Sequence, residues 1–329
     1  MQRRDFLRLA ATTSAALATP ALPLLAQAAD TPKIIRLDFA TYSPPSLVLK
    51  KFGWLEEDVK SNGTSVKWVL SQGSNRALEY LNSDSIDFGS TAGLAALLAR
   101  ANGNPVKAVY IYSRPEWTAL AVQKDSRVQS IKELKGKKIA ATKGTDPYLF
   151  LLRALHENDL SKSDVEIVHL QHADGRIALE QKRVDAWAGL DPHLAASELE
   201  AGSRLIYRNV NFNTYGFLNV SESFAARHPE SVKQVLRAYE RARLWIIQNP
   251  DATARLIADE AKLSLPVAQL QLKRNDFSHP LIGQEHIDAL RAAAPILLQE
   301  ELVQSGTDLP KTINALIDPS FAQGVVARA

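Results

Sequence analysis

The sequence contains no cysteine, and its only methionine is Met1. The absence of cysteine excludes disulfide bonds, a lipid anchor on a cysteine, Cys-bound cofactors and enzymes with a cysteine nucleophile. Cysteine avoidance suits an oxidising compartment, and methionine avoidance prevents sulfoxide damage. Neither reason alone accounts for both absences in a chain of 329 residues. We therefore interpret them as sulfur economy in a protein made when sulfur is scarce, which favours a sulfur-containing ligand.

Several motifs of catalysis and cofactor binding are also missing. Lys143-Gly144-Thr145 looks like the end of a phosphate-binding Walker loop, but the earlier glycine and its spacing are absent. There is no G-x-G-x-x-G dinucleotide motif and no G-x-S-x-G nucleophile elbow. His169 and His172 are close in sequence, but no cysteine or obvious carboxylate partner completes a metal site. We therefore expect a protein that is not an enzyme and that needs no metal or cofactor.

The N-terminus has the pattern of a bacterial export signal. Arg3-Arg4-Asp5-Phe6-Leu7 precedes an apolar stretch over residues 9–25, and Ala26-Gln27-Ala28 is a small-x-small cleavage pattern. The paired arginines resemble a twin-arginine signal. A membrane anchor is the alternative, but Pro20 and Pro23 break the stretch, and a spanning helix needs about 20 strongly apolar residues. We expect residues 1–28 to be a signal peptide, cleaved near Ala28, and the mature protein to be periplasmic.

The mature protein is expected to be nearly neutral. The formal charge of the chain is +3, and Arg3, Arg4 and Arg8 against Asp5 give the signal +2, which leaves +1. No cluster of lysine and arginine stands out, so the sequence gives no indication of binding to nucleic acid or to an anionic membrane. Hydrophobic residues make up 46% of the chain, and about 300 residues remain after cleavage. This length suits one large domain or two smaller ones.

Strand-like and helix-like patterns alternate along the mature chain, which predicts an α/β fold with largely parallel sheets. The expected strands are residues 34–41, 65–70, 86–89, 106–112, 119–123, 137–141, 165–169, 184–188 and 214–220. The expected helices are residues 47–59, 75–81, 93–101, 147–158, 175–182, 194–199 and 230–248. From residue 222 onward the pattern is almost wholly helical.

Four turns that lead from a predicted strand into a predicted helix are small and polar. They are Tyr42-Ser43, Ser71-Gln72-Gly73-Ser74, Ser90-Thr91-Ala92-Gly93 and Lys143-Gly144-Thr145-Asp146. Ligands of open α/β sheets bind at such turns, and free N–H groups at helix N-termini bind anions without a charged side chain. The alternative is that the hydroxyl and carboxylate groups only cap helices. Four such turns together favour a binding site for a small anion.

Other polar and aromatic residues lie close to these turns. Trp117 lies between the two α/β blocks, and Trp187 precedes a strand-to-helix turn, so either ring could contact the organic part of a ligand or fill a core. His172 could reach a ligand or be solvated. Asp174, next to a glycine, is interpreted as a helix start rather than as a catalytic acid.

The chain resembles the substrate-binding proteins of ABC importers in the aliphatic sulfonate, taurine and nitrate group. Four segments carry the resemblance: Phe52-Gly53-Trp54-Leu55-Glu56, residues 77–89 (ALEYLNSDSIDFG), residues 135–145 (KGKKIAATKGT) with 151–155, and residues 184–194 (VDAWAGLDPHL). The resemblance covers essentially the whole mature chain. The sequence departs from the sulfonate pattern after Thr91 and at Ser74-Asn75-Arg76, both next to the predicted site.

The resemblance implies a two-lobed periplasmic-binding-protein fold (type II) with two hinge crossings, near Glu116 and Gly216. Lobe one is expected to be residues 29–116 plus 217–329, with the late helices packed on it, and lobe two residues 117–216. It also implies that Asp191 lines the cleft and receives an amine or hydroxyl of the ligand. With the residues of the turns, the candidate ligand-binding set is Tyr42, Ser43, Gly73, Ser74, Ser90, Thr91, Ala92, Trp117, Gly144, Thr145, Asp146, His172, Asp174, Trp187 and Asp191.

The implied function is capture of aliphatic sulfonates, by a monomer, for import through an ABC-transporter permease as a sulfur source. Taurine, nitrate or a thiamine or pyrimidine precursor are alternative ligands, and Arg76 or Arg114 could add a charged contact. An enzyme on the same fold is the alternative of a different class. A sensory or interaction domain is a third alternative, but the mature chain has no DNA-binding or membrane segment through which to signal.

Overall fold

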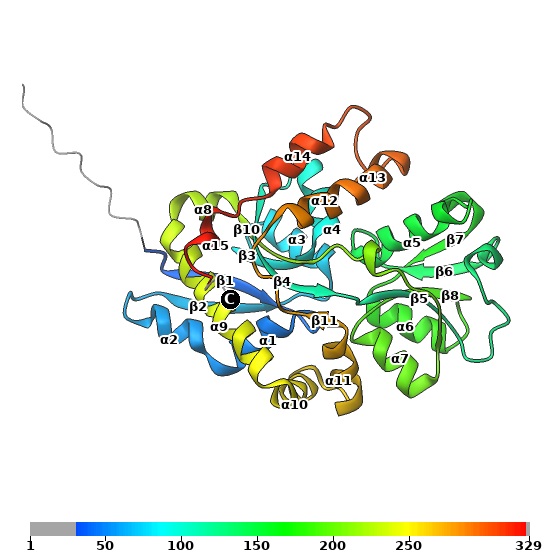
Figure 1. Ribbon diagram of the computed structural model, residues 1–329, viewed down its shortest axis with the longest axis horizontal. Coiled ribbons are helices and arrows are strands. Elements are labelled where there is room, and N and C mark those ends of the chain that lie inside the picture. Colours follow the sequence, from blue (N-terminus) through cyan, green and yellow to red (C-terminus); the bar gives the residue numbers. More distant parts are fainter. Residues whose placement is uncertain (1–30, 327–329) are drawn as a thin grey trace, which may run out of the picture.

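The computed structural model describes residues 31–326. The predicted export signal lies outside the described residues. The chain forms two β-sheets, each with helices on both faces, and the two sheets lie side by side (Figure 1). We call each sheet with the helices packed on it a lobe. Among the described residues, no helix is both long and apolar enough to cross a membrane.

The first sheet has six strands in the order β11-β4-β10-β3-β1-β2. Strand β1 pairs in parallel with β2 and β3, whereas β10 runs antiparallel between β3 and β4. The strands are β1 (Ile34–Phe39), β2 (Ser65–Leu70), β3 (Phe88–Ala92), β4 (Val106–Pro115), β10 (Gly216–Ser221) and β11 (Asn275–Asp276).

The second sheet has five strands in the order β7-β6-β8-β5-β9. Strand β6 pairs in parallel with β7 and β8, and β5 pairs antiparallel with β8 and β9. The strands are β5 (Thr118–Val122), β6 (Lys138–Ala141), β7 (Glu166–His169), β8 (Ala186–Leu190) and β9 (Arg204–Tyr207).

Each sheet is mostly parallel, as expected: only β10 and the short β11 in the first sheet, and β5 in the second, run against the other strands. The chain passes from the first sheet to the second between β4 and β5, and it returns between β9 and β10. A parallel connection within one sheet needs a crossover, usually a helix. Neither passage contains an α-helix. Strands β5 and β10 therefore enter each sheet against the direction of their neighbours.

Helices cover both faces of each sheet (Figure 1). In the first lobe, α1 and α9 pack on one face, and α3 and α4 pack on the other. In the second lobe, α5 packs on one face, with α6 and α7 on the other. The helices up to the end of α9 are α1 (Pro44–Phe52), α2 (Trp54–Lys60), α3 (Ser74–Asn82), α4 (Gly93–Ala101), α5 (Asp146–Glu157), α6 (His172–Glu180), α7 (His193–Ala201), α8 (Glu222–Arg227) and α9 (Pro229–Gln248). Short 3-10 turns are Ile131–Leu134, Lys162–Asp164 and Val210–Phe212.

The last quarter of the chain packs on the first lobe, as we expected, and it also contacts the second lobe. Helix α11 packs against α7 of the second lobe, and Arg274 at its end pairs with Asp191 (3.2 Å) and Glu198 (2.5 Å). After α13, Glu300 pairs with His156 (2.6 Å) at the end of α5. The remaining helices are α10 (Pro250–Ala261), α11 (Leu265–Lys273), α12 (Gln284–Ala293), α13 (Pro295–Gln299), α14 (Leu309–Leu316) and α15 (Ser320–Gln323).

Most predicted elements are present, with three differences. The helix expected over residues 47–59 is two helices, because Gly53 adopts the left-handed conformation (φ 64°) and ends α1 there. The strand expected over 86–89 begins at Phe88 and continues to Ala92, so Ser90 and Thr91 are strand residues rather than turn residues. Strands β9 and β11 were not predicted.

Candidate functional site

The turns at the carboxyl ends of strands from both lobes meet at Gly73. A Cβ atom built on Gly73 would lie 2.9 Å from His172 Nε2 and 2.8 Å from Asn75 Oδ1. A Cβ atom on Gly144 would lie 3.5 Å from Asn75 Cβ. The turn before α3 therefore touches the turns before α5 and α6, as a site between two lobes requires. We call this meeting point the junction.

Two helix N-termini at the junction present unpaired backbone amides. The first N–H groups of an α-helix have no partner within the helix. Among the described residues, no group accepts a hydrogen bond from the amides of Ser74 and Asn75 in α3 or of Asp146 in α5. These helices have nine and twelve residues, so both carry a dipole with its positive end at the junction. An anion at this point would accept hydrogen bonds from both lobes.

Buried polar side chains with no hydrogen-bond partner among the described residues lie at the same ends of the strands. Nearly all buried polar groups in proteins are paired, so a group of unpaired ones indicates a place for a polar ligand. The unpaired atoms are Ser43 Oγ, Ser71 Oγ, Asn75 Oδ1, Ser90 Oγ, Gln171 Oε1 and His172 Nε2.

Helix capping does not explain the polar side chains of the predicted turns. Helices α1, α3, α4 and α5 begin without a side-chain cap hydrogen bond. Thr145 Oγ1 donates instead to the carbonyl oxygen of Thr142 (2.6 Å), and Ser74 Oγ accepts from the amide of Ala92 (3.0 Å). Both bonds shape the turns themselves.

The N-terminus of α4 is not free, contrary to our expectation for the third turn. The amide of Gly93 donates to the carbonyl oxygen of Thr214 (2.7 Å), and the amide of Leu94 donates to Thr214 Oγ1 (2.8 Å). Thr214 lies in the returning passage just before β10, so the passage itself occupies this helix end. Thr91 also turns away, because its hydroxyl accepts from Asn219 Nδ2 (2.7 Å).

Asp146 ties both passages between the lobes to α5. Its carboxylate accepts from Trp117 Nε1 (3.0 Å) in the first passage. It also accepts from the hydroxyl (2.8 Å) and amide (3.2 Å) of Thr214 in the second passage. Burial raises the pKa of Asp146, and the hydrogen bonds from Trp117 and Thr214 oppose that rise. Asp146 therefore acts within the protein, and it holds the Trp117 ring in place.

Aromatic rings lie beside the junction. The ring of Trp117 is 6.0 Å from that of Tyr42, edge to face, and 6.4 Å from that of Tyr112. The Tyr42 hydroxyl donates to the carbonyl oxygen of Ser90 (3.0 Å). These buried rings form an apolar cluster beside Ser90, so the polar turns lie next to an apolar part of the interior.

Asp38 is a buried carboxyl next to Ser90 that the sequence did not predict. Asp38 Oδ1 accepts a hydrogen bond from the amide of Ser90 (2.8 Å). Burial raises the pKa of Asp38 to about 7, and the hydrogen bond from the Ser90 amide opposes that rise. No motif marked this residue, because it lies inside a predicted strand.

Three other candidates do not lie at the junction. Trp187 is a core residue of the second lobe, because its fully buried ring packs against Gly175, where an added Cβ would lie 2.6 Å from Nε1. Asp191 accepts from the amide of Ala195 (2.8 Å) and pairs with Arg274, so both of its oxygens are used within the protein. Asp174 is exposed in the first turn of α6, as expected for a helix start.

The arginines that we considered have partners elsewhere. Arg76 pairs with Glu79 (2.6 Å), and both side chains are largely exposed. The guanidinium of Arg114 lies 5.7 Å from the Tyr215 ring. The buried donors at the junction are therefore backbone amides and hydroxyls, and the exposed Lys143 adds a cationic side chain in the turn before α5.

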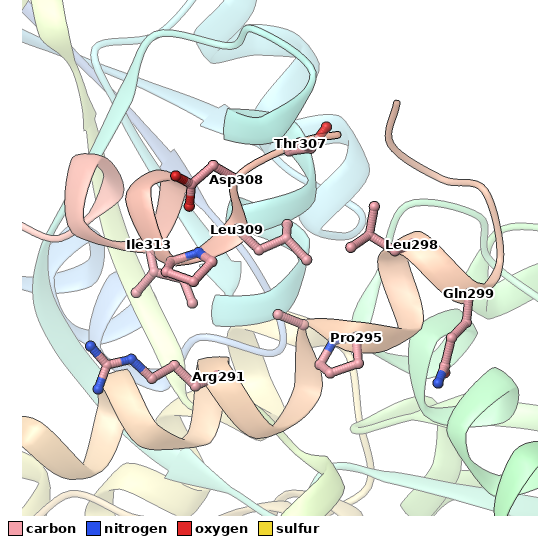
Figure 2. A pocket seen from close by; sticks show the side chains of 10 residues that line it. Arg291, Pro295, Leu298, Gln299, Thr307, Asp308, Leu309 and Ile313 are labelled. Atoms are coloured by element: carbon pink, nitrogen blue, oxygen red, sulfur yellow. The ribbon is translucent and has the colours of Figure 1, made fainter. Parts of the chain in front are cut away.

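A separate, mostly apolar pocket lies between α12, α13 and α14 (Figure 2). Its volume is about 610 Å³. Figure 2 shows Leu298, Leu309 and Ile313 around the hollow, with Arg291 and Gln299 at its edges. None of its lining residues belongs to the junction.

The model of the family described as NMT1/THI5 like matches residues 43–253. The match begins at Ser43 and includes both passages between the lobes. The chain belongs to the NMT1/THI5-like family. The two sheets with flanking helices confirm the two-lobed α/β fold that the sequence predicted.

Similar proteins of known name share most of the chain. A relative from Bacillus subtilis (strain 168) is 28% identical over 285 residues, 86% of each chain, and its name refers to the binding of aliphatic sulfonates. The structure of the alkanesulfonate-binding protein SsuA from Xanthomonas axonopodis pv. citri, bound to MOPS, superposes with a TM-score of 0.79 at 25% identity, covering 86% of this chain and 99% of SsuA. The desulfurization enzyme DszB, at 18% identity and a TM-score of 0.65, covers 89% of this chain and 98% of its own and shares the fold alone.

Proposed function

We propose that this protein is an extracytoplasmic solute-binding protein that captures aliphatic sulfonates and delivers them to an ABC-transporter permease as a sulfur source. The observation that carries the proposal is the meeting of unpaired amides from α3 and α5 at Gly73, beside buried hydroxyls with no partner among the described residues. This arrangement supplies several neutral hydrogen-bond donors, which suits a monoanion with several oxygen atoms.

The surroundings of the junction support an organic sulfonate over an inorganic anion. The rings of Tyr42 and Trp117 are buried beside the junction, and we propose that the carbon chain of the ligand packs against them. Sulfate and nitrate have no such part. The SsuA protein that superposes on this chain is named for alkanesulfonate binding, and the lack of cysteine and of any methionine after Met1 agrees with a role under sulfur limitation.

Binding without catalysis is part of the proposal. The chain has no cysteine for nucleophilic attack, and no cluster of three metal-ligating side chains occurs within residues 31–326. Among the described residues, the buried carboxyls Asp38 and Asp146 bond to no histidine. In the same part of the chain, the His172 side chain bonds only to the hydroxyl of Thr142, which donates to the carbonyl oxygen of Leu170. An enzyme on this fold is the alternative, and the product analysis described below would detect its activity.

Several further features belong to the same proposal. The export signal over residues 1–28, periplasmic localisation, the monomeric state and lobe boundaries at 117 and 216 are proposed from the sequence. The proposed ligand contacts are those candidates that the structure brings to the junction or beside it: Tyr42, Ser43, Gly73, Ser74, Ser90, Trp117, Gly144, Thr145 and His172. The carboxylate of Asp146 is proposed to position Trp117, and the backbone amide of Asp146 is a proposed ligand contact.

Thermal unfolding of the mature protein should show which anion the site binds. We expect alkanesulfonates to raise the melting temperature, because a ligand that binds only the native state at 100 times its Kd adds about 2.7 kcal/mol to the free energy of unfolding. The panel contains alkanesulfonates, taurine, a sulfonate buffer, sulfate, nitrate and thiamine precursors, with product analysis of each mixture. Ser90→Ala should weaken sulfonate binding roughly fivefold through one lost hydrogen bond, whereas the exposed Ser163→Ala should leave it unchanged.

A rise with nitrate or a thiamine precursor, and none with any sulfonate, would contradict the sulfonate assignment and leave a binding protein for another ligand. Release of sulfite or another product from a sulfonate would contradict the binding-only role.

A further inference from the structure

His172 occupies a special position among the junction residues. It is the first residue of α6 in the second lobe, its side chain is 1% exposed, and its Nε2 atom faces Gly73 of the first lobe. The two nitrogens of the ring have different surroundings. Nδ1 contacts Thr142 Oγ1 at 3.1 Å, and Nε2 has no hydrogen-bond partner among the described residues.

The contact with Thr142 determines which ring nitrogen carries the proton. The Thr142 hydroxyl lies 2.7 Å from the carbonyl oxygen of Leu170, and a carbonyl can only accept. The hydroxyl proton is therefore directed at Leu170, and Thr142 Oγ1 has only lone pairs to offer to His172. Nδ1 must then donate, so in a neutral ring Nε2 carries a lone pair.

The ring is neutral under ordinary conditions. Burial, together with the nearby His193, lowers the pKa of His172 to about 3. Burial, with Arg176 nearby, also lowers the pKa of His193 to about 4. At neutral pH, Nε2 is therefore an acceptor rather than a donor.

A second unpaired acceptor faces the same glycine. Asn75 Oδ1 lies 2.8 Å from the position of a Cβ on Gly73, and His172 Nε2 lies 2.9 Å from it. Two buried acceptors thus stand close to the amides of Ser74 and Asn75, which are donors. The junction therefore offers both donors and acceptors. An anion that carries no N–H or O–H group can use only the donors.

We propose that His172 is a specificity-determining residue that accepts a hydrogen bond from the ligand, so that the site prefers sulfonates with an ammonium or hydroxyl group close to the sulfonate. This inference rests on the proposed function, because the sulfonate is taken to bind the amides of α3 and α5. A ligand without the donor leaves Nε2 buried and unpaired, which weakens binding by about 10- to 100-fold.

The test compares ligands of nearly equal size by isothermal titration calorimetry. Propane-1-sulfonate, 2-aminoethanesulfonate and 2-hydroxyethanesulfonate differ in one terminal group: a methyl, an ammonium or a hydroxyl. We expect at least one of the two donor-bearing ligands to bind 10- to 100-fold more tightly than propane-1-sulfonate. His172→Leu should remove that preference, and His172→Gln, which keeps an acceptor oxygen, should retain part of it.

Thr142→Val provides a variant that leaves His172 itself unchanged. Without the hydroxyl, Nδ1 is no longer forced to carry the proton, so the ring can present N–H at Nε2 and the preference should shrink or reverse. The ¹⁵N chemical shifts of His172 should report a proton on Nδ1 in the native protein and its redistribution in Thr142→Val. If Thr142 served only to stabilise the fold, Thr142→Val would change neither the ligand preference nor the tautomer of His172.

Three outcomes would overturn the inference. Equal binding of all three ligands would show that Nε2 does not select a donor, while the proposed function would stand. Uptake of about one proton per bound sulfonate, measured in buffers of different ionisation enthalpy, would show a charged ring that donates instead. Failure of all three to bind would overturn the proposed function and this inference together.

Discussion

Gly73→Ala is expected to weaken ligand binding at least 100-fold while both lobes remain folded. The added Cβ would lie 2.8 Å from Asn75 Oδ1 and 2.9 Å from His172 Nε2, closer than side chains tolerate. The His172 ring is buried and bonded to Thr142, so it cannot easily move away. The backbone of Gly73 is extended (φ 167°), a conformation that alanine adopts without strain. The substitution therefore acts on the approach of the two lobes.

A matched glycine tests this explanation. Gly324 has φ −94°, and no atom lies within 4 Å of an added Cβ, so Gly324→Ala should leave binding and melting temperature unchanged. Calorimetric titration with the best sulfonate of the panel measures the affinity, and thermal unfolding confirms that each variant is folded. Native affinity in a folded Gly73→Ala protein would show that the ligand does not bind where the turns of α3, α5 and α6 meet.

Asp146→Ala is expected to have the largest effect on stability, a loss of about 3 kcal/mol in the free energy of unfolding. Removal of the carboxylate leaves Trp117 Nε1 and the Thr214 amide buried without partners, and each such group costs about 1–3 kcal/mol. Ligand binding should also fall, because the Trp117 ring loses the bond that orients it. Urea denaturation measures the stability, and fluorescence of the tryptophans reports the change at Trp117.

Two other substitutions show whether the loss of stability is due to the hydrogen bonds of Asp146 or would follow from the loss of any carboxylate. Asp146→Asn keeps one acceptor oxygen and avoids a buried charge, so it should lose less stability than Asp146→Ala. Asp174→Ala removes an exposed carboxylate from the first turn of α6 and should change the free energy of unfolding by less than about 1 kcal/mol. Equal effects of Asp146→Ala and Asp174→Ala would contradict the role of Asp146 in holding the passages.

Local sequence signals predicted most of the elements and the turns before α1, α3 and α5. Alternation of apolar residues marks β2, and glycine and proline mark the turn before α5, because these features depend on neighbours in sequence. The family resemblance rests on segments of the same kind. It predicted the two-lobed fold, and the match over residues 43–253 confirms the family.

Features that depend on distant residues were not predicted. The N-terminus of α4 is polar and small in sequence like the other three, but Thr214, 121 residues beyond Gly93, occupies it. Asp191 was predicted to contact the ligand, but its carboxylate pairs with Arg274, 83 residues later in the sequence. Trp187 alternates with small residues in a strand, and only the packing of Gly175 against its ring shows that it belongs to the core. No local pattern contains these contacts.

The most direct test of the central claim is a crystal structure of the mature protein with a bound alkanesulfonate. The account predicts that the sulfonate oxygens accept hydrogen bonds from the amides of Ser74 and Asn75 in α3 and of Asp146 in α5, with the carbon chain toward Trp117. A sulfonate found elsewhere, for example in the apolar pocket between α12 and α14 (Figure 2), with the junction empty, would contradict it.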